Sequence, residues 1–400
     1  MNGIKKVIDD IFWIGGSDRR LARFENIFPI PEGVSYNSYF IDDEKTAVFD
    51  TADITISDQY LENLKTVISG KKLDYLVVLH MEPDHCSLIN TVVTMFPEVT
   101  VVSSSKSFEF MKQFFPESEN YKKLEVKEGD ELSTGKHTFK FVAAPMVHWP
   151  EVLMAYDVTS KALFAADAFG TFGALDGGLF ADEYDYEKDF LDSARRYYAN
   201  IVGKYGMPVQ TVLKKAAGLD IKLILSLHGP VWRENIGWLL DKYQKWSTYT
   251  AETDDIAVVY GSLYGHTASA AEAVAASIRE KTGKNVKVYD VSGTDVSYLI
   301  GEVWRCSKIA LICPTYNGGI YPPMEAFIND MLALGVQNRI FALGQNGTWA
   351  PVTVKLMTDK LATLKNVKIL EQNLTIKSAL SAGDMDAVQV FADAVANSRF

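Results

Sequence analysis

Short apolar runs separated by polar segments fill the first part of the chain. Apolar runs of this length predict strands, and longer segments with helical spacing predict helices. The helices expected here cover 57–69 and 186–205, among short strands. Those strands are expected at 36–41, 46–49, 75–79, 99–103, 137–144, 153–157, 162–165 and 222–226.

Strands and helices alternate in the remainder of the chain. The strands are expected at 256–260, 286–290, 308–313, 339–343 and 367–370, and the helices include 268–281 and 385–396. Such alternation predicts a doubly wound parallel sheet. A polar stretch at 248–255 separates the two patterns, so we expect domains at 1–250 and 251–400.

Composition excludes several classes of protein. The net charge is −11 and no long run of Lys or Arg occurs, which argues against nucleic acid and anionic membranes as partners. No apolar run approaches the roughly 20 residues of a membrane span, and no apolar segment follows Met1–Lys6 to form a signal peptide. Three scattered cysteines with no Cys-x-x-Cys pair exclude a disulfide framework and a rubredoxin-type module, and they indicate a reducing cytoplasm.

Candidate metal ligands are concentrated in one hexapeptide. His80, Glu82, Asp84 and His85 lie within six residues, directly after a predicted buried strand. Carboxylate oxygens mixed with imidazole nitrogens, without a thiolate, suit iron, zinc or manganese. A purely structural role explains an isolated histidine well but explains this cluster poorly.

Three further candidates follow the ends of apolar strands. They are His148, Asp167 and His228. Because strand ends converge at one edge of a sheet, we expect these side chains to meet the hexapeptide. His137 and His266 are expected to have roles other than metal binding.

These residues carry a resemblance to a known fold. The pattern His80-x-Glu82-x-Asp84-His85 with the three strand-end residues resembles the metallo-β-lactamase fold. Asp50 is similar to the early aspartate of that superfamily, which usually supports the ligands. Glu82 stands where hydrolases of the superfamily carry His, and this form resembles the flavodiiron proteins, also called A-type flavoproteins. The resemblance covers nearly the whole chain and implies an N-terminal αββα sandwich and a C-terminal flavodoxin-like sheet.

The resemblance implies a non-haem diiron site. His80, Glu82 and His148 would hold one iron, and Asp84, His85 and His228 the other, with Asp167 as the bridge. Glu82 adds a negative charge that would stabilise ferric iron, whereas zinc has no redox chemistry. Trp149 resembles a wall of the active site, although plain packing explains it equally well.

Loops at three strand ends of the second domain predict an FMN site. The first has the pattern Ser-x-x-Gly-x-Thr, which resembles the flavodoxin phosphate loop, and it precedes a helix whose N-terminus favours an anion. Either Trp349 or Tyr316 can cover the flavin ring, and the loop before Trp349 is one residue longer than the common flavodiiron form. The expected FMN contacts are Ser262, Leu263, Tyr264, Gly265, His266, Thr267, Pro314, Thr315, Tyr316, Asn317, Gly318, Asn346, Gly347 and Trp349.

The function that the resemblance implies is reduction of O₂ to water, of NO to N₂O, or of both. Electrons would come from a separate carrier, such as rubredoxin, a coenzyme F420-type donor or a reductase. The resemblance also implies a head-to-tail homodimer or a dimer of dimers. A zinc-dependent hydrolase fused to a flavodoxin module is the alternative, and a pure electron-transfer module with a closed structural metal site is a third. Metal and flavin content separates the first two, and an open coordination position argues against the third.

Overall fold

The computed structural model describes residues 3–400, which form two compact units. The first unit contains the chain up to residue 198 together with 207–244, and the second contains 199–206 and 245–400. Residues 1 and 2, which belong to the expected first domain, lie outside the described residues.

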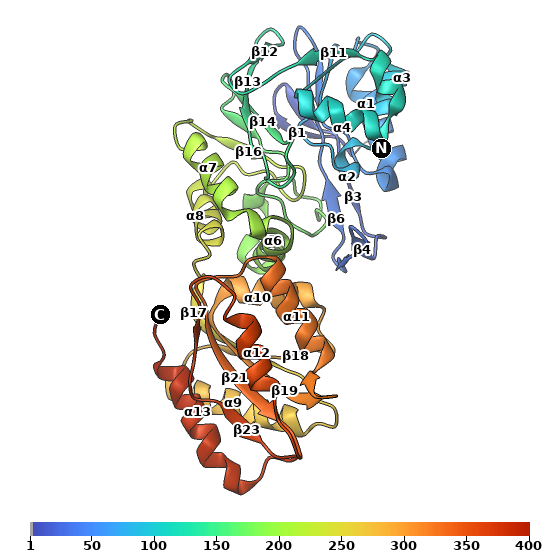
Figure 1. Ribbon diagram of the computed structural model, residues 1–400. Helices are drawn as coiled ribbons and strands as arrows, with labels where there is room; N and C mark the ends of the chain where they lie inside the picture. Colours follow the sequence, from blue (N-terminus) through green and yellow to red (C-terminus); the bar gives the residue numbers. More distant parts are fainter. Residues whose placement is uncertain (1–2) are drawn as a thin grey trace. The chain divides into compact units, whose positions relative to one another are not determined.

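Two sheets form the centre of the first unit (Figure 1). The order of the seven-stranded sheet is β1 (Lys5–Ile8), β2 (Ile11–Trp13), β7 (Tyr39–Ile41), β8 (Ala47–Phe49), β9 (Tyr75–Val77), β10 (Thr100–Ser103) and β11 (Lys122–Glu125). The order of the five-stranded sheet is β12 (Glu131–Ser133), β13 (Thr138–Ala143), β14 (Leu153–Asp157), β15 (Ala162–Phe164) and β16 (Leu223–Leu225). Two short ribbons pair β3 (Gly16–Asp18) with β6 (Val34–Tyr36) and β4 (Arg23–Phe24) with β5 (Phe28–Pro29).

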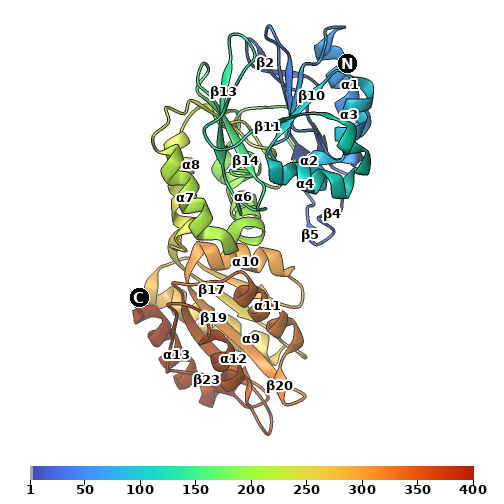
Figure 2. The same ribbon diagram turned by 45° about the horizontal axis from the view of Figure 1, so that its top comes forward.

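Helices cover the outer faces of both sheets. Figures 1 and 2 place α1, α3 and α4 beside the first sheet and α6, α7 and α8 beside the second, which is the expected αββα sandwich. Their bounds are α1 (Ser57–Ile68), α2 (Pro83–Cys86), α3 (Ile89–Met95), α4 (Ser105–Phe114), α5 (Tyr186–Asp189), α6 (Leu191–Tyr197), α7 (Gly206–Ala216) and α8 (Ile236–Ser247).

Aromatic rings fill the space between the two sheets. Phe49 of β8 lies 4.8 Å from Phe139 of β13 and 4.2 Å from Phe164 of β15, measured between ring centroids, and all three are fully or almost fully buried. Rings of this size remove much apolar surface from water and pack strongly in pairs. This packing fixes how the strand ends of the two sheets face each other.

The expected continuous helix over 186–205 is wrong. The segment consists of α5, then α6, a π-helical turn at 198–202 and a 3₁₀ turn at 203–205. Phe190 separates α5 from α6 with φ −128°, and its buried ring stacks 5.6 Å from Tyr186. Burial of this ring against its neighbours outweighs the regular spacing that predicted one helix.

The second unit contains one sheet in the order β18 (Val286–Asp290), β17 (Thr253–Tyr260), β19 (Cys306–Tyr316), β21 (Ile340–Asn346) and β22 (Lys368–Ile369), with all these neighbours parallel. This confirms the expected doubly wound sheet. The short strand β23 (Leu374–Ile376) extends parallel to β21, and β20 (Gly319–Ile320) turns back antiparallel on β19. The helices are α9 (His266–Thr282), α10 (Val296–Arg305), α11 (Pro322–Ala333), α12 (Thr353–Leu361) and α13 (Met385–Asn397).

The core of this unit lies between the sheet and α9 with α13. Ala271 and Ile278 of α9 and Phe391 of α13 are buried there against strand residues such as Val258 and Ile312. Small side chains on α9 let the helix approach the sheet closely, which fixes the start of α9 at the end of β17. No helix within residues 3–400 is long and apolar enough to cross a bilayer.

Candidate metal centre and flavin pocket

Strand β9 delivers four of the candidate metal ligands. After β9 the chain extends through His80 and reaches Glu82, whose backbone is extended, and Pro83 then starts the single helical turn α2. Proline suits this first helical position because no donor is needed there. The turn places Asp84 and His85 beside each other. The extended segment therefore presents His80 and Glu82 in one direction, and the helical turn presents Asp84 and His85 in another.

The other candidates come from the second sheet. His148 lies in the loop between β13 and β14, Asp167 follows β15 and His228 follows β16. The structure brings all seven predicted residues together, in one group of His80, Glu82, His148 and Asp167 and another of Asp84, His85 and His228. We call His80, Glu82 and His148 position 1, and Asp84, His85 and His228 position 2.

The donor atoms of position 1 converge on one point. Glu82 Oε2 lies 3.2 Å from His80 Nε2 and 2.9 Å from His148 Nε2. Position 2 is equally compact, since Asp84 Oδ2 lies 3.2 Å from Nε2 of both His85 and His228.

Asp167 connects the two positions through its two oxygens. Oδ2 lies 3.5 Å from His80 Nε2 and 3.3 Å from His148 Nε2. Oδ1 lies 3.0 Å from His85 Nε2 and 3.7 Å from His228 Nε2. One carboxylate can therefore serve two metal ions, as in other two-metal sites.

The charges in this centre depend on one another. Burial by itself would lower the pKa of His85, but Asp84 and Asp167 raise it to about 10. Burial would raise the pKa of Asp167, but His85 and His148 hold it well below its usual range. Protons on the imidazoles thus balance the carboxylates where no metal does so.

The donor set fits two divalent cations. Across residues 3–400, both oxygens of Asp84 and Oδ1 of Asp167 are buried yet accept no hydrogen bond. Leaving such atoms unpaired is costly, and a cation satisfies them. Three carboxylates and four imidazoles without thiolate suit iron or manganese better than structural zinc.

Asp50 and Trp149 lie around the metal centre. Asp50 is buried, and its Oδ1 accepts hydrogen bonds from the backbone N–H of Leu79 at 2.8 Å and of His80 at 3.2 Å. The Trp149 ring packs edge-on against His80 at 5.5 Å. Asp50 therefore holds the start of the ligand loop, and Trp149 packs beside a candidate ligand.

His137 lies apart from both metal positions. Its Nδ1 lies 2.6 Å from Asp157 Oδ2, and its Nε2 lies 3.2 Å from Asp10 Oδ2. These contacts pair this buried histidine with two carboxylates outside the metal centre.

Three residues near the ligands were missed by the sequence analysis. Glu151 contacts His80. Glu25 lies near Glu82, and although this residue is exposed, partial loss of hydration and the charge of Glu82 raise the pKa of its carboxyl. The Tyr197 ring lies 5.6 Å from His228, and its buried hydroxyl has no partner in the described part of the chain. Glu151, three residues after His148, could have been found by searching beside the ligands, but nothing in the sequence marks Glu25 or Tyr197.

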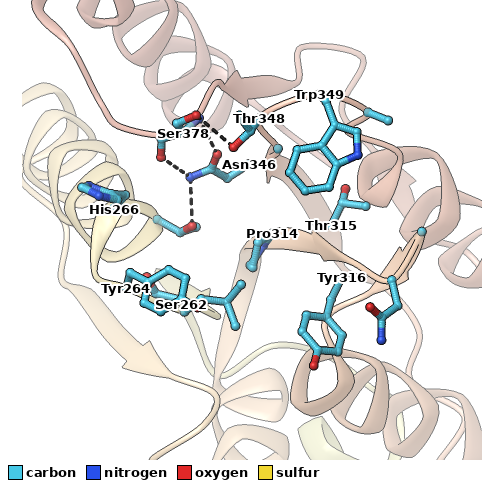
Figure 3. A pocket seen from close by; sticks show the side chains of 16 residues that line it. Ser262, Tyr264, His266, Pro314, Thr315, Tyr316, Asn346, Thr348, Trp349 and Ser378 are labelled. Carbon is cyan, nitrogen blue, oxygen red and sulfur yellow. Dashed lines mark hydrogen bonds between the residues drawn. The ribbon is translucent and has the colours of Figure 1, made fainter.

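A cavity of about 470 Å³ lies at the strand ends of the second unit (Figure 3). All the expected FMN contacts line this cavity except Gly265, and Thr348, Ala350 and Ser378 line it in addition. Gly265 shapes the loop instead: its φ is +91°, and its N–H donates to Ser262 Oγ at 3.1 Å. A positive φ of this kind favours glycine.

Asn346 ties three loops of the cavity together, as Figure 3 shows. Its Nδ2 donates to Thr267 Oγ1 at 3.2 Å and to the Ser378 carbonyl at 2.9 Å. Its Oδ1 accepts from the Ser378 N–H at 3.0 Å. This one side chain sets the spacing between the start of α9 and the loops after β21 and β23.

Aromatic side chains stand exposed around the cavity. Trp349 is 89% exposed and Tyr264 is 88% exposed, whereas Tyr316 is 42% exposed. The tight Asn317-Gly318 turn between β19 and β20 has φ values of +50° and +71° and positions Tyr316 beside the cavity. Apolar rings around a phosphate-type loop fit a flat ring with an anionic tail, which is the shape of FMN.

Comparisons with known proteins match both parts of the chain. Residues 34–229 match the model of the ODP family beta lactamase, and residues 258–388 match the flavodoxin model. An uncharacterised protein of Methanocaldococcus jannaschii is 30% identical over 88% of each chain. The anaerobic nitric oxide reductase flavorubredoxin of Salmonella paratyphi A is 28% identical over 96% of this chain and 79% of its own length.

Solved structures extend the likeness over the whole chain. The rubredoxin oxygen:oxidoreductase of Desulfovibrio gigas superposes with a TM-score of 0.91, at 26% identity over 98% of each chain. The flavodiiron protein of Giardia intestinalis superposes with a TM-score of 0.92, at 26% identity over 99% of this chain and 96% of its own. With its two matched modules and its seven-residue metal centre, this chain belongs to the flavodiiron protein family.

Proposed function

We propose that this protein is an oxidoreductase that reduces O₂ to water, NO to N₂O, or both, at a diiron centre supplied with electrons by FMN. The observation that carries this proposal is the bridging position of Asp167, with one oxygen toward each of two ligand groups. The relatives named as a nitric oxide reductase and as a rubredoxin oxygen:oxidoreductase support it.

Each ligand has a definite role in this proposal. His80, Glu82 and His148 hold one iron at position 1, and Asp84, His85 and His228 hold the other at position 2. When bound, the two irons would pass electrons to the diatomic substrate, and FMN would replenish them.

Two aromatic side chains lie beside the centre, and one of them supplies a hydrogen-bond donor. Trp149 covers the His80 side of the centre, and Tyr197 lies on the His228 side. Burial raises the pKa of Tyr197 well above its usual range, so its hydroxyl stays protonated and can donate a hydrogen bond toward the centre.

The cavity of the second unit would hold FMN. Backbone N–H groups of the Ser262–Thr267 loop and the N-terminus of α9 would bind the phosphate, while Trp349 or Tyr316 would cover the ring. The exposure of both aromatic rings beside the cavity supports this assignment.

Four further features belong to the proposal. The chain divides into functional domains at 1–250 and 251–400, acts in the cytoplasm and works as a head-to-tail homodimer or dimer of dimers. An external carrier such as rubredoxin, an F420-type donor or a reductase supplies the electrons, which the relative named rubredoxin oxygen:oxidoreductase supports.

Metal and flavin content tests the proposal directly. Protein produced with ample iron should contain about two irons and one FMN per chain, and the reduced protein should consume O₂ or, with oxygen excluded, NO. Ample iron matters because zinc competes strongly for most sites. Two zinc ions with FMN under these conditions, and hydrolysis of a test ester, would instead establish the hydrolase alternative.

A further inference from the structure

The outer nitrogens of three of the four metal-facing histidines have different surroundings. His80 Nδ1 lies 2.8 Å from the carboxylate of Glu151, and His228 Nδ1 lies 2.8 Å from the backbone carbonyl of Ser35. His85 Nδ1 is buried and has no hydrogen-bond partner within residues 3–400. A charged acceptor therefore supports position 1, whereas position 2 has a neutral acceptor and an unpaired nitrogen.

The geometry at His80 fixes which nitrogen carries the proton. Its Nε2 faces Glu82 and Asp167, so a metal at position 1 requires the Nε2 lone pair. The proton is then on Nδ1 and is donated to Glu151 Oε1. A carboxylate that accepts this proton raises the electron density at Nε2 and strengthens the bond to the metal.

Glu151 is built into the site. It is 2% exposed, and its Oε1 also accepts a hydrogen bond from the Met81 N–H at 2.9 Å. Oε2 is buried without a partner in the described chain. The negative charge is therefore little compensated except by the His80 imidazole, which makes the pair sensitive to what His80 binds.

We propose that Glu151 is a positioning residue that strengthens His80 as a ligand and makes position 1 bind its metal more tightly than position 2. This inference rests on the proposed function only in that both positions hold a metal. It predicts that the two ions are lost in sequence rather than together.

The Glu151→Gln substitution tests the charge of this side chain while keeping its shape. In Glu151→Gln the amide oxygen can still accept from His80 and Met81, so only the charge is lost. We expect position 1 to bind Fe²⁺ about 10- to 100-fold more weakly, with position 2 unchanged. Glu151→Asp, which keeps the charge, should retain metal better than Glu151→Gln.

The measurement is stepwise loss of Fe²⁺ from the full-length protein under a competing chelator, without oxygen. His228→Ala marks position 2, so the Glu151→Gln, His228→Ala double variant should weaken both steps. Asp157→Asn is the matched control, because Asp157 and His137 form a second buried carboxylate–histidine pair outside the metal centre. It should leave both metal steps unchanged.

The outcomes are distinguishable. Equal weakening of both steps, no weakening, or a Glu151→Asp variant that is worse than Glu151→Gln would overturn the role of the charge. A wild-type protein that takes up two Fe²⁺ in any of these cases keeps the proposed function intact. A wild-type protein that takes up none overturns both.

Discussion

The metal centre and the flavin cavity are built on opposite principles. The seven metal-site side chains are all buried and come from strand ends on two different sheets, whereas the cavity is lined by loops at the ends of one parallel sheet. Charge balance among buried groups determines the first site, and backbone shape with exposed aromatic rings determines the second. The metal centre should therefore fail abruptly when one charged group is changed, and the flavin site gradually.

Asp167→Ala should have the largest effect. Removing the bridging carboxylate leaves four imidazoles around two positions with only two carboxylates, so we expect both metals and all reductase activity to be lost while FMN stays bound. Metal analysis and flavin absorbance of the purified variant measure this. Retention of about two metals per chain would show that Asp167 does not bridge them.

Glu82→His should change the metal rather than remove it. The substitution takes away a negative charge, so position 1 should prefer zinc. Reductase activity should fall by at least about 100-fold, because changing a residue that binds the metal should cost at least as much as changing a residue that only hydrogen-bonds to a ligand. FMN content should not change. A variant that reduces O₂ or NO at the parental rate would contradict the role given to Glu82.

The buried pair of His137 and Asp157 lies outside the metal centre, so it shows what a buried carboxylate and histidine contribute to stability without a metal. Burial would lower the pKa of His137, but Asp157 and Asp10 raise it above 6.5; burial would raise the pKa of Asp157, but His137 and Ser160 lower it below 3.8. The pair therefore stabilises the folded protein fully between about pH 3.8 and pH 6.5, the ordinary pKa values of the two groups. This stabilisation is lost as pH rises through the raised pKa of His137 or falls through the lowered pKa of Asp157.

Asp157→Asn should therefore lower the free energy of unfolding by about 3 kcal/mol near pH 6 and by less at higher pH, with metal content unchanged. Guanidinium unfolding of the full chain at several pH values measures this difference. A loss that does not depend on pH would mean that shape rather than charge holds the pair.

Asn346→Ala should have the smallest effect. Loss of its three hydrogen bonds loosens the loops around the cavity. Because these bonds contribute about 1 kcal/mol each, the affinity for FMN should fall by about tenfold and by no more than about 150-fold, with both metals retained. Fluorescence titration of the flavin-free protein measures this affinity. Asn366→Ala is the control, since Asn366 makes an exposed contact with Asn338 and does not line the cavity.

The metal ligands were predictable because each follows a recognisable apolar strand, and the flavin loops because they follow alternating strands of a parallel sheet. Glu25 and Tyr197 were not, because their proximity to the ligands depends on packing between distant segments, whereas Glu151 lies three residues after His148 and could have been found by a search beside the ligands. The short strands at the start of the chain, such as β4, are too brief to show a period. The break at Phe190 came from burial of one aromatic ring, which no local pattern records.

Each metal position takes ligands from both sheets of the first unit. Position 1 takes His80 and Glu82 from the first sheet and His148 from the second, and position 2 takes Asp84 and His85 from the first sheet and His228 from the second. Bound ions would therefore act as cross-links through the middle of the sandwich. Metal loading should raise the resistance of this unit to unfolding, by about 4 kcal/mol where the free ion is a thousandfold above its dissociation constant. Iron supply would then govern how long the folded protein survives as well as how fast it works.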